Sequence, residues 1–375
     1  MANNVTYCDL KVFHKGFSKY SEYMVFIVCI SGCILNCFNI VVLSRKQMRC
    51  PTNSILLSLA VADILVMLEY MPFSYLTAKG PDYSAYYYSY YFAVYIILHA
   101  IFSQSFHFIS CCITIILALW RYIAVKFPAN NKKWCSPRIT MWTIFLTYTL
   151  CPYICVPILL SSTVSNTVAY VDKNNNILGL KEVGNNTENL TKVKLFYANS
   201  NESIFKPISL FIYGVVVKLV PCILLTVLSI LIIIELLATK ERRRKLMAPT
   251  TGKEGNSMIK KKVNQRFLEK EKQAYRTTKM LLVILMLFLS VEFPQAIYGL
   301  LNHIIGDVFQ IECYQPIGGF LDLIALLYCS INFFLYCIMS QKFREVFKEI
   351  FFPYIPGFRK SKCQWSTTVS TMVEL

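Results

Sequence analysis

The sequence predicts an all-α membrane protein, a bundle of seven transmembrane helices followed by a short amphipathic eighth helix. Of its 375 residues, 55% are hydrophobic and only 16% are charged, whereas soluble domains carry about 25% charged residues. The apolar residues form seven runs that are nearly free of charge, and the net charge of +17 falls mainly between them. This pattern indicates a chain whose main solvent is lipid, and it argues against a nucleic-acid-binding protein.

Each apolar run is long enough to be a transmembrane helix, because about 20 apolar residues cross the hydrocarbon core. Backbone polar groups cannot be left open to lipid, so we expect helices rather than strands. The first residues lack the apolar segment of a signal peptide, so the first span is expected to act as its own insertion signal. We place the spans at residues 23–43, 54–76, 92–125, 139–161, 208–238, 278–304 and 317–339.

An eighth helix is expected directly after the seventh span. Apolar residues recur there at helical spacing, with basic residues between them, as in a helix that lies on a membrane surface. The apolar positions are Phe343, Val346, Phe347, Ile350 and Phe351, and the basic ones are Lys342, Arg344 and Lys348.

The distribution of Lys and Arg predicts the orientation. With the N-terminus outside, the inner side carries 28 Lys and Arg against seven acids, whereas nine basic and nine acidic residues balance outside. An excess of Lys and Arg marks the cytoplasmic side. We therefore expect a multi-pass protein of the plasma membrane with an extracellular tail (1–21), a seven-helix domain (22–340) and a cytoplasmic segment (341–375). The domain includes a second outer loop (162–206) and a third inner loop (239–276).

Glycosylation sequons agree with this orientation. Asn4, Asn185, Asn189 and Asn201 each begin an Asn-X-Ser/Thr triplet, and all four fall on the predicted outer side. Three of them lie in the second outer loop. A loop of this length is usually either a lid or disordered, and we expect partial disorder.

Several polar, proline and aromatic residues within and beside the spans form short motifs. They are, in chain order, Asn36, Asp63, Trp120-Arg-Tyr122, Trp142, Pro221, Pro294 and Asn332-Phe-Phe-Leu-Tyr336. In order and spacing the set resembles the rhodopsin-like G-protein-coupled receptors, and the resemblance covers nearly the whole chain. Trp120-Arg-Tyr122, Glu292-Phe-Pro-Gln295 and Ser330-Ile-Asn-Phe-Phe-Leu-Tyr336 together resemble the myosuppressin and FMRFamide-type neuropeptide receptors of invertebrates.

The resemblance implies roles for the motif residues. Arg121, Tyr122 and Tyr336 are expected to meet a heterotrimeric G protein, and Pro221 and Pro294 to kink helices that move on activation. Asp63, near Asn36 and Asn332, is expected either to hold sodium or to be a structural carboxylate satisfied by protonation or water. The family usually places an acid before Arg121, where this chain has Trp120, so we expect raised basal signalling. Further expected partners are arrestin and membrane lipid, and no cofactor other than sodium is implied.

Ionisable residues inside the spans suggest a ligand site, because charges in a bilayer are costly and are often functional. An acidic, aromatic pocket suits a guanidinium beside an aromatic ring, as in a peptide that ends in Arg-Phe-amide. Lys218 is placed to neutralise one of the acids. The alternative for any single aromatic residue is packing or contact with lipid. The predicted ligand-binding residues are Glu69, Gln104, His107, Lys218, Glu292, Phe293, Gln295, Tyr298 and Asp322.

The cysteines suggest one disulfide. Most of the fifteen lie in apolar runs, where Cys behaves as a small hydrophobic residue. The two cysteines that usually join the third helix of the family to its second outer loop are both missing. Cys8 and Cys313 are clearly on the predicted outer side and are expected to form a bridge, the alternative being two free thiols.

Other protein classes fit less well. A transporter would usually show internal repeats, and none is visible. An enzyme is rejected because the spans contain no HExxH, GxSxG, paired aspartates or His cluster. A chemosensory or orphan receptor for a small molecule remains the alternative within the receptor class, although amines are disfavoured because Ser103 stands where amine receptors have Asp.

Overall fold

A computed structural model of the chain describes residues 8, 10–78, 89–171, 177–178, 191–200, 204–247 and 258–353. Within these residues, seven helices are long and apolar enough to cross a membrane, so the predicted seven-helix bundle is confirmed. The four predicted glycosylation sites, Asn4, Asn185, Asn189 and Asn201, lie outside the described residues.

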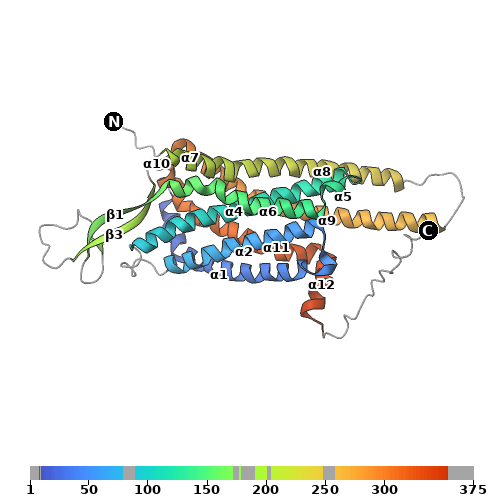
Figure 1. Cartoon of the computed structure of the whole chain (residues 1–375), viewed down its shortest axis with the longest axis horizontal. Coiled ribbons are helices and arrows are strands. Elements are labelled where there is room, and N and C mark those ends of the chain that lie inside the picture. Colours follow the sequence, from blue (N-terminus) through green and yellow to red (C-terminus); the bar gives the residue numbers. More distant parts are fainter. Residues whose placement is uncertain are drawn as a thin grey trace.

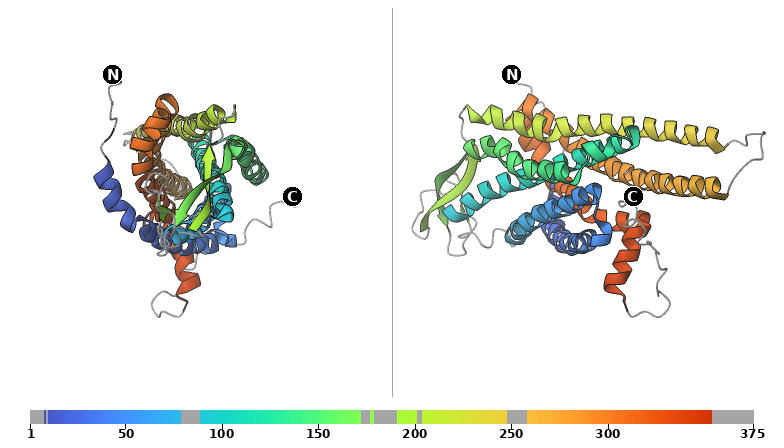
Figure 2. Two further views of the ribbon diagram at one scale, coloured as in Figure 1. Left: turned by 90° about the vertical axis from the view of Figure 1, so that its left-hand side faces the viewer. Right: turned by 45° about the vertical axis from the view of Figure 1, so that its right-hand side comes forward.

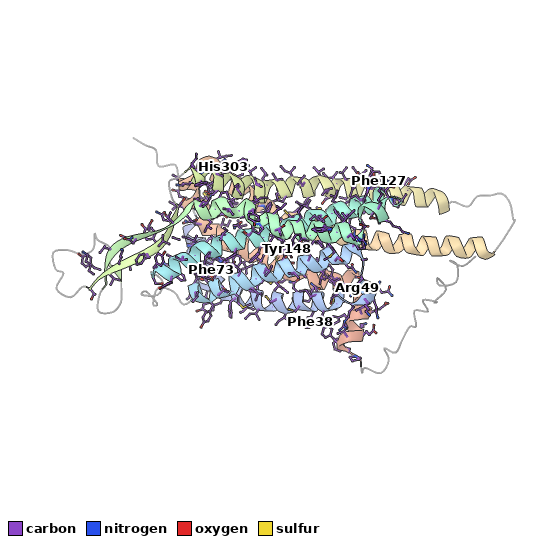
Figure 3. All side chains as sticks on the ribbon, viewed as in Figure 1. Phe38, Arg49, Phe73, Phe127, Tyr148 and His303 are labelled. Carbon is purple, nitrogen blue, oxygen red and sulfur yellow. A yellow bond between two sulfur atoms is a disulfide. The ribbon has the colours of Figure 1, made fainter. Side chains whose placement is uncertain are left out.

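The bundle is elongated, with a small sheet at one end and the last helix at the other (Figure 1). We call these the hairpin end and the α12 end. Phe73 and His303 lie toward the hairpin end, whereas Phe38 and Arg49 lie toward the α12 end (Figure 3). The long elements are α1 (Lys11–Leu43), α2 (Pro51–Ala78), α4 (Tyr90–Lys126), α6 (Pro137–Leu160), α7 (Phe205–Phe211) with η3 (Ile212–Leu219) and α8 (Val220–Met247), α9 (Met258–Ile305) and α11 (Gln315–Met339). The short ones are η1 (Lys46–Met48), α5 (Asn131–Trp134), α10 (Asp307–Phe309), η4 (Gln310–Tyr314) and α12 (Gln341–Phe351).

Serine caps define where several helices begin. The hydroxyl oxygens of Ser89, Ser136 and Ser340 each accept a hydrogen bond from the backbone N–H three residues further on, at the starts of α4, α6 and α12. Such caps satisfy backbone donors that have no partner within the helix. Pro137 follows Ser136 in the first turn of α6, where its missing N–H costs nothing.

Three helices extend far beyond the predicted spans, by about nine residues or more. α1 begins at Lys11, so much of the segment assigned to the N-terminal tail (1–21) is helical. α8 continues to Met247 and α9 begins at Met258, so helices replace most of the predicted inner loop (239–276). Hydropathy marks only where a helix leaves the hydrocarbon, whereas Glu, Arg, Lys and Leu continue a helix well outside it.

A three-stranded antiparallel sheet, in the order β2-β1-β3, lies at the hairpin end. β1 (Ser162–Val171) pairs with β3 (Thr191–Ser200), and β2 (Ile177–Leu178) pairs with the far end of β1. The predicted second outer loop thus contains paired strands, which the sequence analysis did not predict and which are rich in β-branched and aromatic residues. Seen from the hairpin end, the strands cross in front of the helices (Figure 2, left).

At the α12 end, α12 packs against α1 and α11 through aromatic rings. The ring centroids of Phe38 and Phe351 are 5.1 Å apart, and those of Phe333 and Phe347 are 5.6 Å apart. Arg344 donates hydrogen bonds to the carbonyls of Cys337 and Ile338, which lie in the last turn of α11. This helix lies where the sequence predicted an amphipathic segment.

A disulfide joins Cys8 to Cys313 at the hairpin end, with 5.4 Å between the two Cα atoms. It ties the segment before α1 to η4, which leads into α11. The bridge spans nearly the whole chain and connects its first described residue to the seventh span.

Candidate functional site

A π-helical segment brings a lysine into the bundle. η3 (Ile212–Leu219) ends where the N–H of Val220 donates to the carbonyl of Val215, five residues back. The next residue, Pro221, has no N–H to donate, so the regular hydrogen-bond ladder is interrupted there. Lys218 is 3% exposed within this segment. π-helical turns are frequent at functional sites.

Lys218 lies in a buried polar network that joins η3, α4 and α9. Its Nζ is 3.2 Å from Glu292 Oε2 and 2.8 Å from His107 Nε2, and it also donates to Gln295 Oε1. His107 Nε2 is 3.0 Å from the same Glu292 oxygen. Gln295 Nε2 in turn donates to the carbonyl of Leu321 on α11 at 3.0 Å. The buried Glu292 carboxylate is therefore paired, as a charge in a low-dielectric interior requires.

A cavity of about 20 Å³ adjoins this network, with room for about one water molecule. Asp322 of α11 contributes a second carboxylate to its wall, within electrostatic range of Lys218 and His107. The wall is formed by α2, α4, η3, α9 and α11 through Val66, Tyr70, Ser103, Gln104, His107, Tyr213, Lys218, Gln295, Asp322, Ala325, Leu326 and Cys329.

A second acid–histidine pair lies between α2 and α4. Glu69 Oε1 contacts His99 Nδ1, and the Glu69 Oε2 atom is buried without a hydrogen-bond partner among the described residues. The His99 ring stacks on Phe73 at 3.8 Å between centroids and meets Tyr70 edge-on at 5.1 Å. Tyr70 also lines the cavity, so the Glu69–His99 pair lies next to the network around Lys218.

The structure brings together most of the predicted ligand-binding residues. Five of the predicted residues line the cavity: Gln104, His107, Lys218, Gln295 and Asp322. Glu292 adjoins it through Lys218, and Glu69 forms the separate pair with His99. Phe293 and Tyr298 are not brought to the cavity. Phe293 is 41% exposed on the bundle surface, and Tyr298 packs against Phe309 at 5.9 Å.

Sequence reasoning missed several polar residues near this site. Glu22 accepts a hydrogen bond from Thr77 at 2.9 Å, and it was missed because the first span was started one residue later. Tyr213 of η3 hydrogen-bonds to Tyr314 of η4, which links two π-helical segments. Cys111 lies within an apolar run and was not singled out, and its sulfur is 3.6 Å from His107 Nε2. The i, i+4 spacing of His107 and Cys111 was the available signal.

Asp63 lies deeper in the bundle and is completely buried. Its two carboxylate oxygens accept hydrogen bonds from Ser110 Oγ and Asn332 Nδ2, both at 3.0 Å. Asn36 donates to the carbonyl of Cys329 at 3.0 Å, close by on α11. Asn332 Oδ1 is buried without a partner among the described residues. A set of oxygen atoms with one left unpaired fits a hard cation such as sodium.

Toward the α12 end, Arg121 lacks the acidic neighbour expected from the family. Trp120, which stands before it, donates from its indole nitrogen to Thr140 Oγ1 on α6 at 3.0 Å. Arg121 Nε is buried without a hydrogen-bond partner among the described residues. Tyr336 of α11 is also buried, with its ring 5.6 Å from that of Phe343.

An ion pair links α4 to α8 close to Arg121. Lys126 Nζ is 3.4 Å from Glu235 Oε1 and donates to the Tyr122 hydroxyl at 2.7 Å. The Lys126 side chain is 38% exposed, so solvent screens this pair and it contributes little to stability. Tyr122 is therefore held on the side of α4 that faces α8.

Comparisons with known proteins agree with this architecture. The family model described as "Serpentine type 7TM GPCR chemoreceptor Srw" matches residues 23–353. The G-protein coupled receptor dmsr-1 of Caenorhabditis elegans is 27% identical, over 94% of this chain and 73% of that protein. The sex peptide receptor of Drosophila melanogaster is 26% identical, over 97% of this chain and 80% of that protein. The thyrotropin-releasing hormone receptor of Mus musculus is 25% identical, over 87% of this chain and 77% of that protein.

Proposed function

Because the chain belongs to the serpentine seven-transmembrane G-protein-coupled receptor family of the Srw type, we propose that it is a neuropeptide receptor. Membership makes it a multi-pass signalling receptor of the plasma membrane and not an enzyme. The sex peptide and thyrotropin-releasing hormone receptors are named for peptide ligands, which favours a peptide here. We further propose an amidated peptide that ends in Arg-Phe-amide.

We propose that the N-terminus and the hairpin end face outward. This orientation puts the basic segments at the α12 end in the cytoplasm, as the excess of Lys and Arg favours. The cavity then lies in the outer half of the bundle, where a ligand from outside reaches it. The glycosylation sequons Asn4, Asn185, Asn189 and Asn201 are then extracellular.

The charge balance at the cavity carries the proposal for a cationic ligand. Lys218 pairs with Glu292, and one ammonium cannot neutralise the Asp322 carboxylate as well. With Asp322 ionised and His107 neutral, the site therefore has one negative charge in excess. A guanidinium at Asp322 would supply the missing positive charge through two parallel hydrogen bonds. Tyr70 and the rings around His99 offer faces for the neighbouring phenylalanine.

Ligand binding requires the bundle to widen. A cavity of about 20 Å³ is far smaller than ligand sites of roughly 300–1,000 Å³. A peptide tail therefore binds a conformation in which α9 and α11 have moved apart, and binding raises the population of that conformation. Movement at the Pro294 kink would open the α12 end, where Arg121 and Tyr336 meet the G protein. The two ends are reciprocally coupled.

Asp63, Ser110 and Asn332 would hold the proposed sodium ion between the two ends. Its positive charge would offset the buried carboxylate. We also propose that the basic face of α12 contacts anionic lipid and that the receptor recruits arrestin.

The test is G-protein activation in transfected cells by a panel of amidated peptides that end in Arg-Phe-amide, each with an Arg→Ala partner. We expect activation by the Arg peptides and its loss with the Ala versions. Asp322→Asn should reduce potency at least about tenfold, because it removes a charge-assisted pair. Glu292→Gln should reduce it less, since that carboxylate is already paired with Lys218.

Glu312→Gln serves as a matched control, because Glu312 is an acid at the same end of the bundle that does not line the cavity. Its potency should stay within a factor of two to three of wild type, the usual spread of such contributions. No response from receptor that reaches the cell surface would reject the peptide ligand. The search would then turn to small molecules, as the chemoreceptor description of the family favours.

A further inference from the structure

Three potential metal ligands converge beside the cavity. His107 and Cys111 are one turn apart on α4, and Glu292 faces them from α9. One ligand atom from each of them lies within 4.8 Å of the other two. His107 Nε2 is 3.0 Å from Glu292 Oε2 and 3.6 Å from Cys111 Sγ. Bonds of about 2.0–2.3 Å from one Zn²⁺ ion reach all three atoms after small side-chain rotations.

We propose that His107, Cys111 and Glu292 form a Zn²⁺ site in the outer half of the bundle. Imidazole, thiolate and carboxylate are the ligand types that zinc takes in proteins, with a fourth position left for water. The sulfur ligand disfavours Mg²⁺ and Ca²⁺, which take oxygen ligands. Binding releases one proton, as the Cys111 thiol becomes a thiolate bonded to the metal.

Lys218 is the competitor for this site. Its ammonium lies 2.8 Å from His107 Nε2 and 3.2 Å from Glu292 Oε2, so it holds the space where the ion would sit. Zn²⁺ must displace it, and Gln295 and Asp322 remain as partners for the displaced ammonium. Lys218 is therefore expected to weaken metal binding rather than to support it.

The charges around the cavity favour uptake of the ion. With both carboxylates ionised and His107 neutral, Lys218, Glu292 and Asp322 together carry one net negative charge. Zn²⁺ with the Cys111 thiolate adds one positive charge, so the occupied site is neutral. In a low-dielectric interior, a neutral cluster is much less costly than a charged one.

Other polar clusters of the described residues suit zinc less well. Glu69 and His99 supply two ligands, and no third donor joins them in the described part of the chain. The oxygens around Asp63 suit a hard cation. An ion at the three-residue site joins α4 to α9, and it favours the conformation in which these helices stay close.

The test uses full-length receptor in lipid nanodiscs without peptide, titrated with ZnCl₂ and separately with MgCl₂. Competition with a zinc-responsive fluorophore gives the affinity, and thermal unfolding gives the stabilisation. We expect wild type to bind and be stabilised by Zn²⁺ but not by Mg²⁺. His107→Gln and Cys111→Ser should each weaken binding by at least about tenfold, because a protein ligand is lost.

Lys218→Gln gives the distinguishing result, since it should strengthen Zn²⁺ binding by about tenfold or more by removing a competing charge. Controls are Cys112→Ser and His303→Gln, which lie outside the three-residue site and should leave the affinity unchanged. If Lys218→Gln does not reach the membrane, the Zn²⁺ affinities of the His107→Gln and Cys111→Ser variants still show whether the site exists.

The proposal is overturned if wild type shows no Zn²⁺ binding, or if the His107→Gln and Cys111→Ser variants bind as tightly as wild type. Weaker binding by folded Lys218→Gln would also count against it, because that would make Lys218 a supporting residue. The measurement contains no peptide, so its outcome is independent of the proposed neuropeptide ligand.

Discussion

Trp120 stands where the family usually has the acid that restrains the next residue, Arg121. Its indole donates to Thr140 Oγ1 at 3.0 Å and so anchors α4 to α6. Arg121 is left with a buried Nε that has no partner among the described residues. A buried donor without a partner costs about 1–3 kcal/mol, and a G protein that accepts from it removes this cost. We therefore expect the inactive conformation to be less favoured than in receptors with the acid.

Restoring an acid should lower basal signalling. We expect Trp120→Glu to reduce ligand-independent G-protein activation several-fold, because a carboxylate next to Arg121 would stabilise the resting state by about 1–3 kcal/mol. The measurement is basal activity in transfected cells, normalised to surface receptor.

Trp120→Phe is the matched control, since it keeps a ring but removes the N–H that donates to Thr140. It should retain most of the basal activity. Wild-type receptor that is silent at normal surface levels would contradict the expectation, as would an equal loss in both variants.

The pairing of Lys218 illustrates what residue patterns can predict. The sequence indicated that a lysine in the fifth span would neutralise an acid, but Glu69, Glu292 and Asp322 were all candidates. The backbone hydrogen bond from the N–H of Val220 to the carbonyl of Val215 adds one residue to the helical turn. This extra residue changes the face of the helix on which Lys218 lies. No periodicity of 3.6 residues predicts this rotation, so the choice of Glu292 required the structure.

At the scale of elements, η3 and α9 approach each other through two glycines. A Cβ atom on Gly214 would lie 2.8 Å from the carbonyl oxygen of Gly299, which is backbone and cannot rotate away. Small residues allow helices in membranes to pack this closely. The contact fixes the position of η3, and hence of Lys218, against the helix that carries Glu292.

Gly214→Ala should therefore destabilise the receptor by about 1–3 kcal/mol, as overpacking does in a close-packed core. The measurement is the thermal stability of purified receptor in detergent, together with its surface level in cells.

Gly299→Ala tests the same interface from the other side. Its added Cβ would be 3.4 Å from Gly214 Cα, an ordinary contact, so a much smaller loss is expected. Gly318→Ala, which has no atom within 4 Å of the added Cβ, should behave as wild type. Equal stability of Gly214→Ala and Gly318→Ala would show that the close approach is not required.

Elements differ in how far the sequence predicts them. The seven spans were predicted because a long apolar segment in lipid must satisfy its own backbone hydrogen bonds, which it does as a helix. The ends of α1, α8 and α9 were not, because polar helix formers outside the hydrocarbon give no hydropathy signal. The paired strands β1 and β3 lie in a segment expected to be a loop, where their register depends on partners about thirty residues apart.

At the scale of the whole molecule, the seven helices meet in the membrane, and one covalent link closes the bundle at the hairpin end. Cys8 and Cys313 join the start of the chain to η4. The next residue after Cys313, Tyr314, hydrogen-bonds to Tyr213 of η3. The disulfide therefore stabilises a contact between the fifth and seventh spans at the hairpin end, next to the cavity. The cysteine pair followed from counting outer thiols, whereas the tyrosine pair left no sequence signal.

Removal of this link should loosen the hairpin end without unfolding the spans. We expect Cys8→Ser, Cys313→Ser and the double variant to lose the same stability, about 2 kcal/mol. The low end of the usual range applies because the membrane already confines the chain between the two cysteines. Thermal unfolding of purified receptor measures the loss, and dithiothreitol should bring wild type to the level of the variants without affecting the variants themselves. Cys50→Ser, at an exposed free cysteine of the described residues, is the matched control and should retain wild-type stability and its response to dithiothreitol. Additive losses in the double variant would mean that the two cysteines act separately, and an unchanged wild type in dithiothreitol would mean that the bridge does not hold the hairpin end together.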